Sequence, residues 1–308
     1  MTTHRPLLTV SCLVASIAAI QAQPIASLNA VRRSSESTAI ENAPRKPKAT
    51  VEAPFYIKLY GFYGLLTPGS QISTSYTSGQ SGMTNTGYKN NTTGLGAGPR
   101  AGVGVGVIVS EFINLGIDAD MLFGSTLTTE NNYKGSNYTS TGTTSSTLRV
   151  LSITPNITFK ALSRPAYYIY NRLGLVGGIV MDYKTTSNSL YAPTTGASTT
   201  TLSETDYRQN SLAIGYQAAL GIQFRLGESL RGFAEIVAYN QSFKPKESLY
   251  TSSSTKSGST TKSSYIYQYK SEGEYFNSKQ DGLDVYQSPT YNVVMNSVGV
   301  GAGIIVRF

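Results

Sequence analysis

Hydrophobic and polar residues alternate along most of the chain after residue 54. The pattern is clearest in residues 298–308, where every even position is apolar and glycine fills most odd positions. The even positions are Val298, Val300, Ala302, Ile304, Val306 and Phe308. Because side chains alternate between the two faces of a strand, this two-residue period predicts a strand with one continuous apolar face.

The same period predicts seven earlier strands. They cover residues 55–65, 101–109, 113–123, 151–160, 167–181, 214–225 and 230–239. The connections after the second, fourth and sixth strands are short, whereas the others are long and rich in Ser, Thr, Asn, Gly and Tyr. An even number of strands with strictly alternating short and long connections is typical of membrane β-barrels. A soluble sandwich of eight strands is the alternative, but it does not readily explain this alternation.

The terminal strand resembles the last strand of bacterial outer-membrane β-barrels, which typically ends in phenylalanine after alternating apolar residues. Residues 54–308 as a whole resemble the small OmpA- and OmpX-type barrels. The resemblance implies an all-β fold, namely an eight-stranded antiparallel transmembrane β-barrel with short periplasmic turns and long extracellular loops. It also implies a place in the lipid of the bacterial outer membrane, and a terminal strand, Val298 to Phe308, that the barrel-assembly machinery reads.

Aromatic residues occupy the strand ends that lead into the short turns. On the apolar parity these are Phe55, Phe159, Tyr167, Phe224 and Phe308. Aromatic side chains gather where a membrane meets water. The sequence therefore predicts an aromatic girdle at the inner interface.

The N-terminus has the features of a secretory signal peptide. Arg5 precedes an apolar run from Leu7 to Ile20, and the small residue Ala22 offers a cleavage site. The run is shorter than the roughly 20 residues that a spanning helix needs. We therefore expect a signal peptide at residues 1–22, and a disordered periplasmic tail at residues 23–53, which are polar and basic.

Composition argues against catalysis. The single histidine, His4, and the single cysteine, Cys12, both lie in the expected signal peptide. A mature chain without histidine lacks the commonest general base and a common metal ligand. We expect no enzyme activity, no cofactor and no bound metal. The excess of 25 Lys and Arg over 17 Asp and Glu is weak evidence for a nucleic-acid partner, and none is expected.

Five charged residues lie on the inward parity near the middle of their strands. They are Lys58, Asp118, Asp120, Arg172 and Glu235. Charges in a narrow lumen must pair or stay hydrated, since an isolated buried charge is costly. The strand at 55–65 also places large side chains between two glycine-rich strands, which predicts a packed lumen. The charges could form a structural network that blocks flow, or they could gate ions and small solutes.

The long connections carry the remaining functional signal. The longest, residues 241–290, contains Tyr265, Tyr267 and Tyr269 among Ser and Gly residues. Such tyrosines could contact extracellular proteins or glycans, or they could simply prolong a hairpin beyond the membrane. The sequence therefore predicts a monomeric barrel with a structural role, a surface-interaction role such as adhesion, or both. A small porin-like channel for ions or small solutes is the alternative function.

Overall fold

The computed structural model describes residues 54–66, 72–79, 82–90, 94–272 and 278–308. The predicted signal peptide (1–22) and tail (23–53) lie outside the described residues. All regular elements in the described ranges are strands, and these ranges contain no helix long and apolar enough to cross a membrane. The strands are β1 (Phe55–Leu66), β2 (Ile72–Gly79), β3 (Gly82–Asn90), β4 (Gly98–Ile108), β5 (Ile113–Phe123), β6 (Leu127–Lys134), β7 (Tyr138–Ser163), β8 (Tyr167–Pro193), β9 (Thr199–Asn210), β10 (Ala213–Arg225), β11 (Leu230–Phe243), β12 (Pro245–Lys256), β13 (Ser259–Lys270), β14 (Ser278–Gln280), β15 (Leu283–Pro289), β16 (Val293–Val294) and β17 (Ser297–Arg307).

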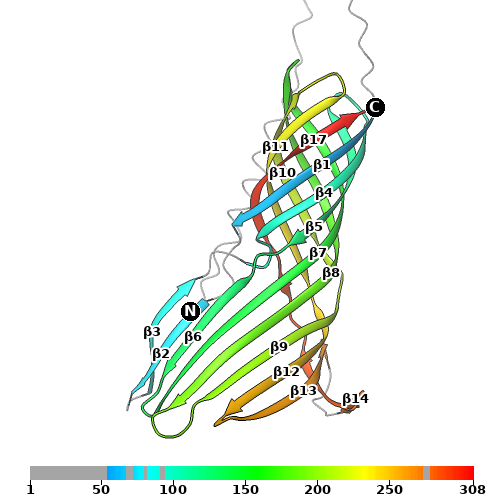
Figure 1. Cartoon of the computed structure of the whole chain (residues 1–308). Coiled ribbons are helices and arrows are strands. Elements are labelled where there is room, and N and C mark those ends of the chain that lie inside the picture. The colour runs from blue at the N-terminus through cyan, green and yellow to red at the C-terminus, as the bar shows by residue number, and fades with distance from the viewer. Residues whose placement is uncertain (1–53, 67–71, 80–81, 91–93, 273–277) are drawn as a thin grey trace, which may run out of the picture. The chain divides into compact units, whose positions relative to one another are not determined.

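Antiparallel pairings link one set of strands edge to edge and return to their starting point. β1 pairs with β4, β4 with β5, β5 with β7, and β7 with β8. β8 pairs with β10, β10 with β11, β11 with β17, and β17 with β1. We call this set the strand ring, and Figure 1 shows its members tilted around a common axis. Each member covers one of the segments that the apolar alternation predicted, except that β4 ends before Val109 and β17 ends before Phe308.

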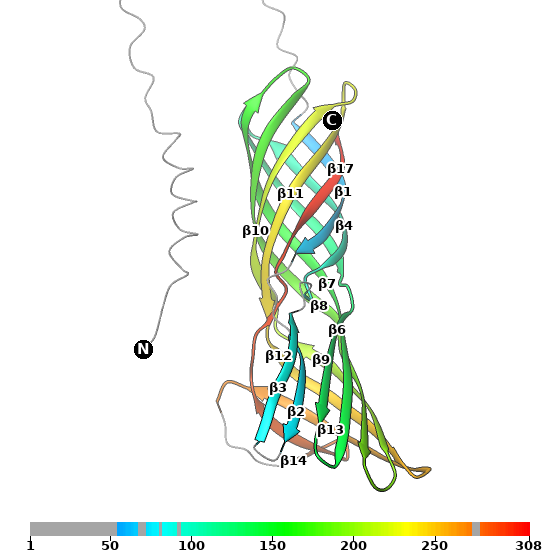
Figure 2. The ribbon, with the colours of Figure 1, turned by 90° about the vertical axis from the view of Figure 1, so that its left-hand side faces the viewer.

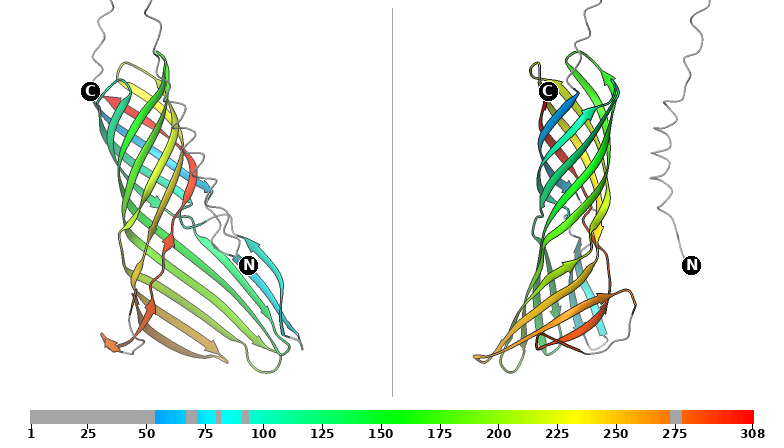
Figure 3. Two further views of the ribbon diagram at one scale, coloured as in Figure 1. Left: turned by 180° about the vertical axis from the view of Figure 1, so that it is seen from behind. Right: turned by 90° about the vertical axis from the view of Figure 1, so that its right-hand side faces the viewer.

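The chain contains more strands than the eight predicted, because the long connections are themselves largely β-structure. They contain β2, β3, β6, β9 and β12 to β16. With the far parts of β7 and β8, most of these strands form a further part of the same sheet in the order β3–β2–β6–β7–β8–β9–β12–β13–β15–β14. The pairs β2–β6 and β13–β15 are parallel and the others are antiparallel. We call it the extension sheet; Figures 2 and 3 show it continuing from one end of the strand ring.

Burial agrees with the predicted faces of the ring strands. Inward residues such as Tyr60 and Arg172 are buried, whereas outward Leu175 and Ile214 are 70% and 67% exposed. Other outward apolar residues that are largely exposed are Ile57, Leu59, Val103, Val105, Ile117, Ile153, Leu173, Ile179, Leu220, Ile236, Val300 and Ile304. A continuous exposed apolar surface of this kind calls for an apolar environment or a partner.

The inward parity of β8 changes at a bulge. Val150 of β7 pairs with Val180, but the neighbouring Arg149 pairs with Asp182, which leaves Met181 as an extra residue on β8. Val176 faces inward before the bulge and Tyr183 faces inward after it. The lumen side of the ring therefore continues directly into one face of the extension sheet.

Glycines on both sides of β1 provide the space for its large inward side chains. Tyr60 lies between Gly102 of β4 and Gly303 of β17, and Lys58 faces Gly104. A Cβ atom at Gly102 would lie 2.6 Å from the ring of Tyr60. Since that distance is far below van der Waals contact, the strands beside β1 require glycine for the lumen to be packed as it is.

Candidate functional site

Four of the five charged residues expected in the lumen form one buried network. Lys58 and Arg172 both donate hydrogen bonds to Asp118, the latter at 2.8 Å, and Arg172 also forms an ion pair with Glu235. Their side chains are at most 7% exposed. The network links β1, β5, β8 and β11 across the lumen, and it compensates charges that would be costly to bury alone.

Asp120, the fifth residue, pairs instead with Arg100. The Arg100 Nη1 atom donates to Asp120 Oδ1 at 2.9 Å, and the guanidinium carbon lies 4.1 Å from the centre of the Tyr239 ring. The hydroxyl of Tyr60 donates to Asp120 Oδ2 at 3.2 Å. Sequence patterning did not predict Arg100, although it has the same parity as the inward Gly102.

The lumen retains little free space beside the network. A cavity of about 30 Å³ lies toward the short-turn end, with Asn156, Arg172, Gln223 and Arg307 among its lining residues. That volume accommodates roughly one or two water molecules. It is a small cavity next to the ion pairs.

An apolar cluster lies at the opposite end of the ring. We call it the apolar cap: Leu95, Leu122, Leu127, Leu148, Val150, Tyr183, Ala213, Phe243, Val293 and Met295. Two connecting segments supply part of it, and a Cβ atom at Gly96 would collide with the carbonyl oxygen of Met295. Met295 N donates to Gln241 O at 2.8 Å, which fixes this crossing to β11. The cap was not predicted, because Leu95 and Met295 lie outside every alternating segment.

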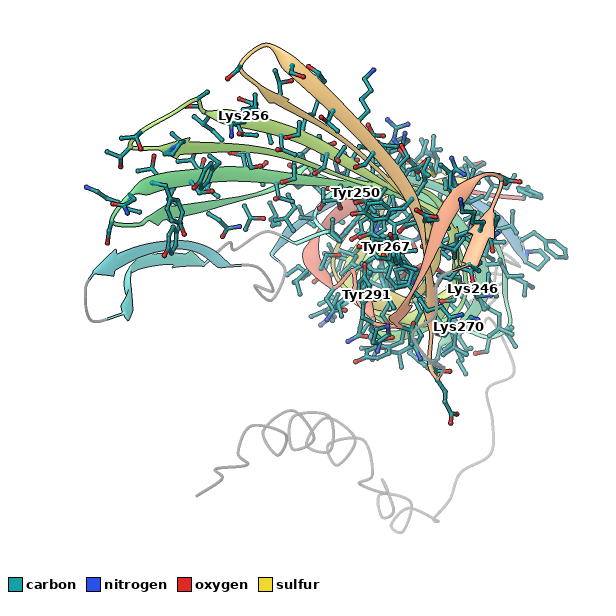
Figure 4. The ribbon with its side chains drawn as sticks, turned by 90° about the horizontal axis from the view of Figure 1, so that it is seen from below. Lys246, Tyr250, Lys256, Tyr267, Lys270 and Tyr291 are labelled. Carbon is teal, nitrogen blue, oxygen red and sulfur yellow. The ribbon has the colours of Figure 1, made fainter. Side chains whose placement is uncertain are left out.

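A connected series of aromatic rings extends from the cap along the extension sheet. Tyr183 contacts Phe243 of the cap, with ring centres 5.6 Å apart, and stacks on Tyr207 at 4.1 Å. We call the following residues the tyrosine chain, since each ring contacts another of the set: Tyr183, Tyr207, Tyr250, Tyr265, Tyr267, Tyr269, Tyr286 and Tyr291. Figure 4 labels three members, Tyr250, Tyr267 and Tyr291, in a view from the extension end.

Hydroxyl groups of the tyrosine chain are held in defined positions. Tyr291 donates to the hydroxyl of Tyr207 at 3.0 Å, and the hydroxyls of Ser248 and Tyr269 lie 3.1 Å apart. Burial raises the pKa of Tyr269 and of Tyr291 above the usual value of a tyrosine. These phenols therefore stay protonated at neutral pH and remain hydrogen-bond donors.

The predicted girdle residues all lie on the exposed side of the ring. Their exposed fractions range from 36% for Phe159 to 60% for Phe308, and Phe55, Tyr167 and Phe224 fall between these values. Phe308 N donates to Phe55 O at 3.0 Å, which places the two ends of this set side by side. A girdle at a membrane interface stays a prediction.

The terminal strand occupies the expected position next to β1. On β17, Val298, Val300, Ala302, Ile304 and Val306 face outward between β1 and β11. Recognition of this strand by assembly machinery stays a prediction. Among the described residues, no three His, Cys, Asp or Glu side chains come close enough together to hold a metal ion.

No protein-family model matches the chain, and the curated proteins contain no match to it. Solved structures similar to it include the outer membrane protease OmpT from Escherichia coli, with 10% identity, coverage of 83% of this chain and 94% of that one, and a TM-score of 0.26. The CymD monoaromatic hydrocarbon channel gives 7% identity, 83% and 89% coverage and a TM-score of 0.18. A Pseudomonas aeruginosa FadL homologue has 6% sequence identity, with coverage of 83% of this chain and 89% of that one, and a TM-score of 0.14. At TM-scores this low, none of these similarities carries a conclusion about fold or activity.

Proposed function

We propose that the protein is an outer-membrane β-barrel that holds the extension sheet outside the cell as an interaction surface. The observation that carries this proposal is the polarity of the strand ring. Its outward residues are apolar and exposed, whereas its inward residues include paired charges such as Arg172 and Asp118. Proteins in water bury their apolar residues and expose their charged ones, whereas membrane β-barrels have an apolar outer face and a polar interior.

The dimensions of the ring strands fit a bilayer. On β10 the outward apolar residues run from Ile214 to Phe224, and a tilted spanning strand needs about 9–11 residues. Within the proposal, the eight ring strands are the transmembrane barrel of the OmpA and OmpX type. The further strands belong to the extension sheet, on the side of the long connections. The short turns near Ser110 and Gly227 then face the periplasm.

Packing of the lumen favours a structural and display role over transport. The charged network crosses the middle of the ring and the apolar cap fills its far end. The proposed function includes no catalytic step, because Asp118 and Asp120 are each held by a buried cation. We propose a monomer surrounded by outer-membrane lipid, inserted by the barrel-assembly machinery, whose sheet contacts extracellular ligands.

A small channel for ions or solutes is the second candidate, favoured by the polar cavity next to Arg172. Planar-bilayer recordings of the purified full-length protein separate the two functions. We expect no steady conductance steps, because the cap and the network close the lumen. Regular steps that disappear in an Asp118→Asn variant would support the channel and overturn the packed-lumen proposal.

Epitope tags test the proposed orientation. Gly196 and Gly258 lie in turns of the extension sheet with open space around them, so insertions there should be tolerated. We expect antibodies to label tags at these two positions in intact Gram-negative cells. Tags in the short turns at Ser110 and Gly227 are the controls, and they should be labelled only after permeabilisation. Labelling of the opposite pair in intact cells would contradict the proposal.

A further inference from the structure

The face of the extension sheet that continues from the lumen is lined with hydroxyl groups. One row of paired residues crosses six strands, and it contains Thr129, Thr144, Ser187, Ser203, Ser252 and Ser263. Hydroxyl oxygens of neighbours in this row lie close together, 3.1 Å for Thr144 and Ser187 and 2.8 Å for Ser252 and Ser263. We call this side of the sheet the inner face.

Charged residues are sorted onto the opposite face of the same strands. Glu130, Lys184, Glu204 and Lys262 have the other parity, and Lys184 and Glu204 form an exposed ion pair at 3.7 Å. On the inner face of β6 to β9, of β12 from Ser248 onward and of β13, the described strand residues carry one charge, on Lys256 at the β12–β13 turn. The inner face is therefore polar and almost uncharged.

Tyrosine rings bound the hydroxyl rows at both ends. At the base of the sheet they belong to the tyrosine chain, which includes Tyr250 in β12. At the far end Tyr138 lies between Tyr133 and Tyr191, with both pairs of ring centres 5.1 Å apart. Tyr250 pairs with Thr205, which pairs with Thr185 of β8, and Thr185 lies six residues from Tyr191, or about 20 Å along an extended strand. A ligand that reached both groups of rings would have to be an extended chain.

We propose that the inner face binds a neutral polysaccharide chain, whose sugar rings stack on the tyrosines and whose hydroxyls bond to the Ser and Thr rows. This inference rests on the proposed display of the sheet outside the cell. Sugar rings present apolar C–H faces edged by hydroxyls, which matches hydroxyl rows bounded at both ends by phenol rings. An anionic polymer would favour a face carrying cations, and a protein would favour an apolar centre. Leu190 and Leu202 are instead exposed on the opposite face.

Calorimetry on the purified full-length protein in detergent micelles tests this inference. The probes are maltohexaose, cellohexaose and chitohexaose, with glucose, N-acetylglucosamine and the acidic hexagalacturonate for comparison. We expect at least one neutral hexasaccharide to bind, and its monosaccharide and the acidic hexamer to bind at least tenfold more weakly. Failure of all three neutral hexasaccharides, or tighter binding of the acidic one, would overturn the inference.

Substitutions on the two faces locate the binding. Tyr250→Ala and Tyr138→Ala should each weaken hexasaccharide binding at least tenfold, whereas Tyr138→Phe, which keeps the ring, should lose less. Leu202→Ala on the opposite face is the matched control and should bind like the parent protein. Equal affinity in all four variants would contradict binding at the inner face.

Failure of this inference is distinguishable from failure of the proposed function. Heat-modifiable mobility on gels reports the folded barrel, and the tags at Gly196 and Gly258 report exposure of the sheet. A folded, surface-labelled protein that binds no neutral hexasaccharide would overturn only the ligand assignment. An unlabelled sheet would overturn the display role, whatever the calorimetry shows.

Discussion

Replacement of Arg172 by methionine is expected to destabilise the folded protein by about 3–5 kcal/mol, the usual cost of removing one partner from a buried ion pair. Arg172 contacts both Asp118 and Glu235, and all three side chains are almost completely buried. Without the guanidinium, two carboxylates share the positive charge of Lys58. Urea unfolding of the full-length protein in lipid vesicles measures the change.

The exposed pair of Lys184 and Glu204 is the control for this substitution. These side chains are 44% and 49% exposed and their charges lie 3.7 Å apart. Lys184→Met should therefore cost less than about 1 kcal/mol, as exposed ion pairs do. The double variant Arg172→Met/Glu235→Gln should recover part of the loss, since it also removes one uncompensated charge. Equal losses for Lys184→Met and Arg172→Met would show that the lumen network contributes nothing specific.

Leu175→Arg is expected to cost about 2–4 kcal/mol, the penalty for a cation at the lipid face of a barrel near the bilayer midplane. Leu175 is the most exposed of the large apolar side chains described, at 70%, and it lies on the outward side of β8 within the ring. In water the same change at an exposed site would alter stability by no more than about 0.5 kcal/mol. The unfolding free energy in vesicles therefore tests the membrane assignment directly.

Leu202→Arg is the matched control. Leu202 is 53% exposed on the extension sheet, which the proposal places outside the bilayer. Its substitution should leave the unfolding free energy nearly unchanged. Similar small effects at Leu175 and Leu202 would mean that the ring does not lie in lipid.

The ring strands could be predicted from the sequence because each has one apolar face. On β10, Leu220 and Ile222 alternate with Gly221 and Gln223. This alternation indicates a strand and also shows which of its two faces is apolar. The extension strands carry no such contrast. In β9, Thr200 and Thr201 face opposite sides with the same chemistry, so no apolar period marks the strand although threonine favours β-structure.

Parity also placed the lumen charges, but it could not assign their partners. In the register of β4 and β5, Asp120 lies opposite Gly102. The long side chain of Arg100, two residues before Gly102, reaches across to Asp120. The apolar cap was beyond prediction for a different reason. It joins Leu95 and Met295, which are far apart in sequence and belong to irregular segments without any local pattern.

The position of β17 between β1 and β11 controls when this molecule can finish folding. When the chain is delivered N-terminus first, β1 keeps one unpaired edge until residues 297–307 arrive, and β11 has another from the time that it arrives. Such edges are templates for aggregation, and contacts between residues so distant in sequence form slowly. The strand ring can therefore close only after β17 is available. Covering the free edges of β1 and β11 until β17 arrives would therefore limit aggregation during folding.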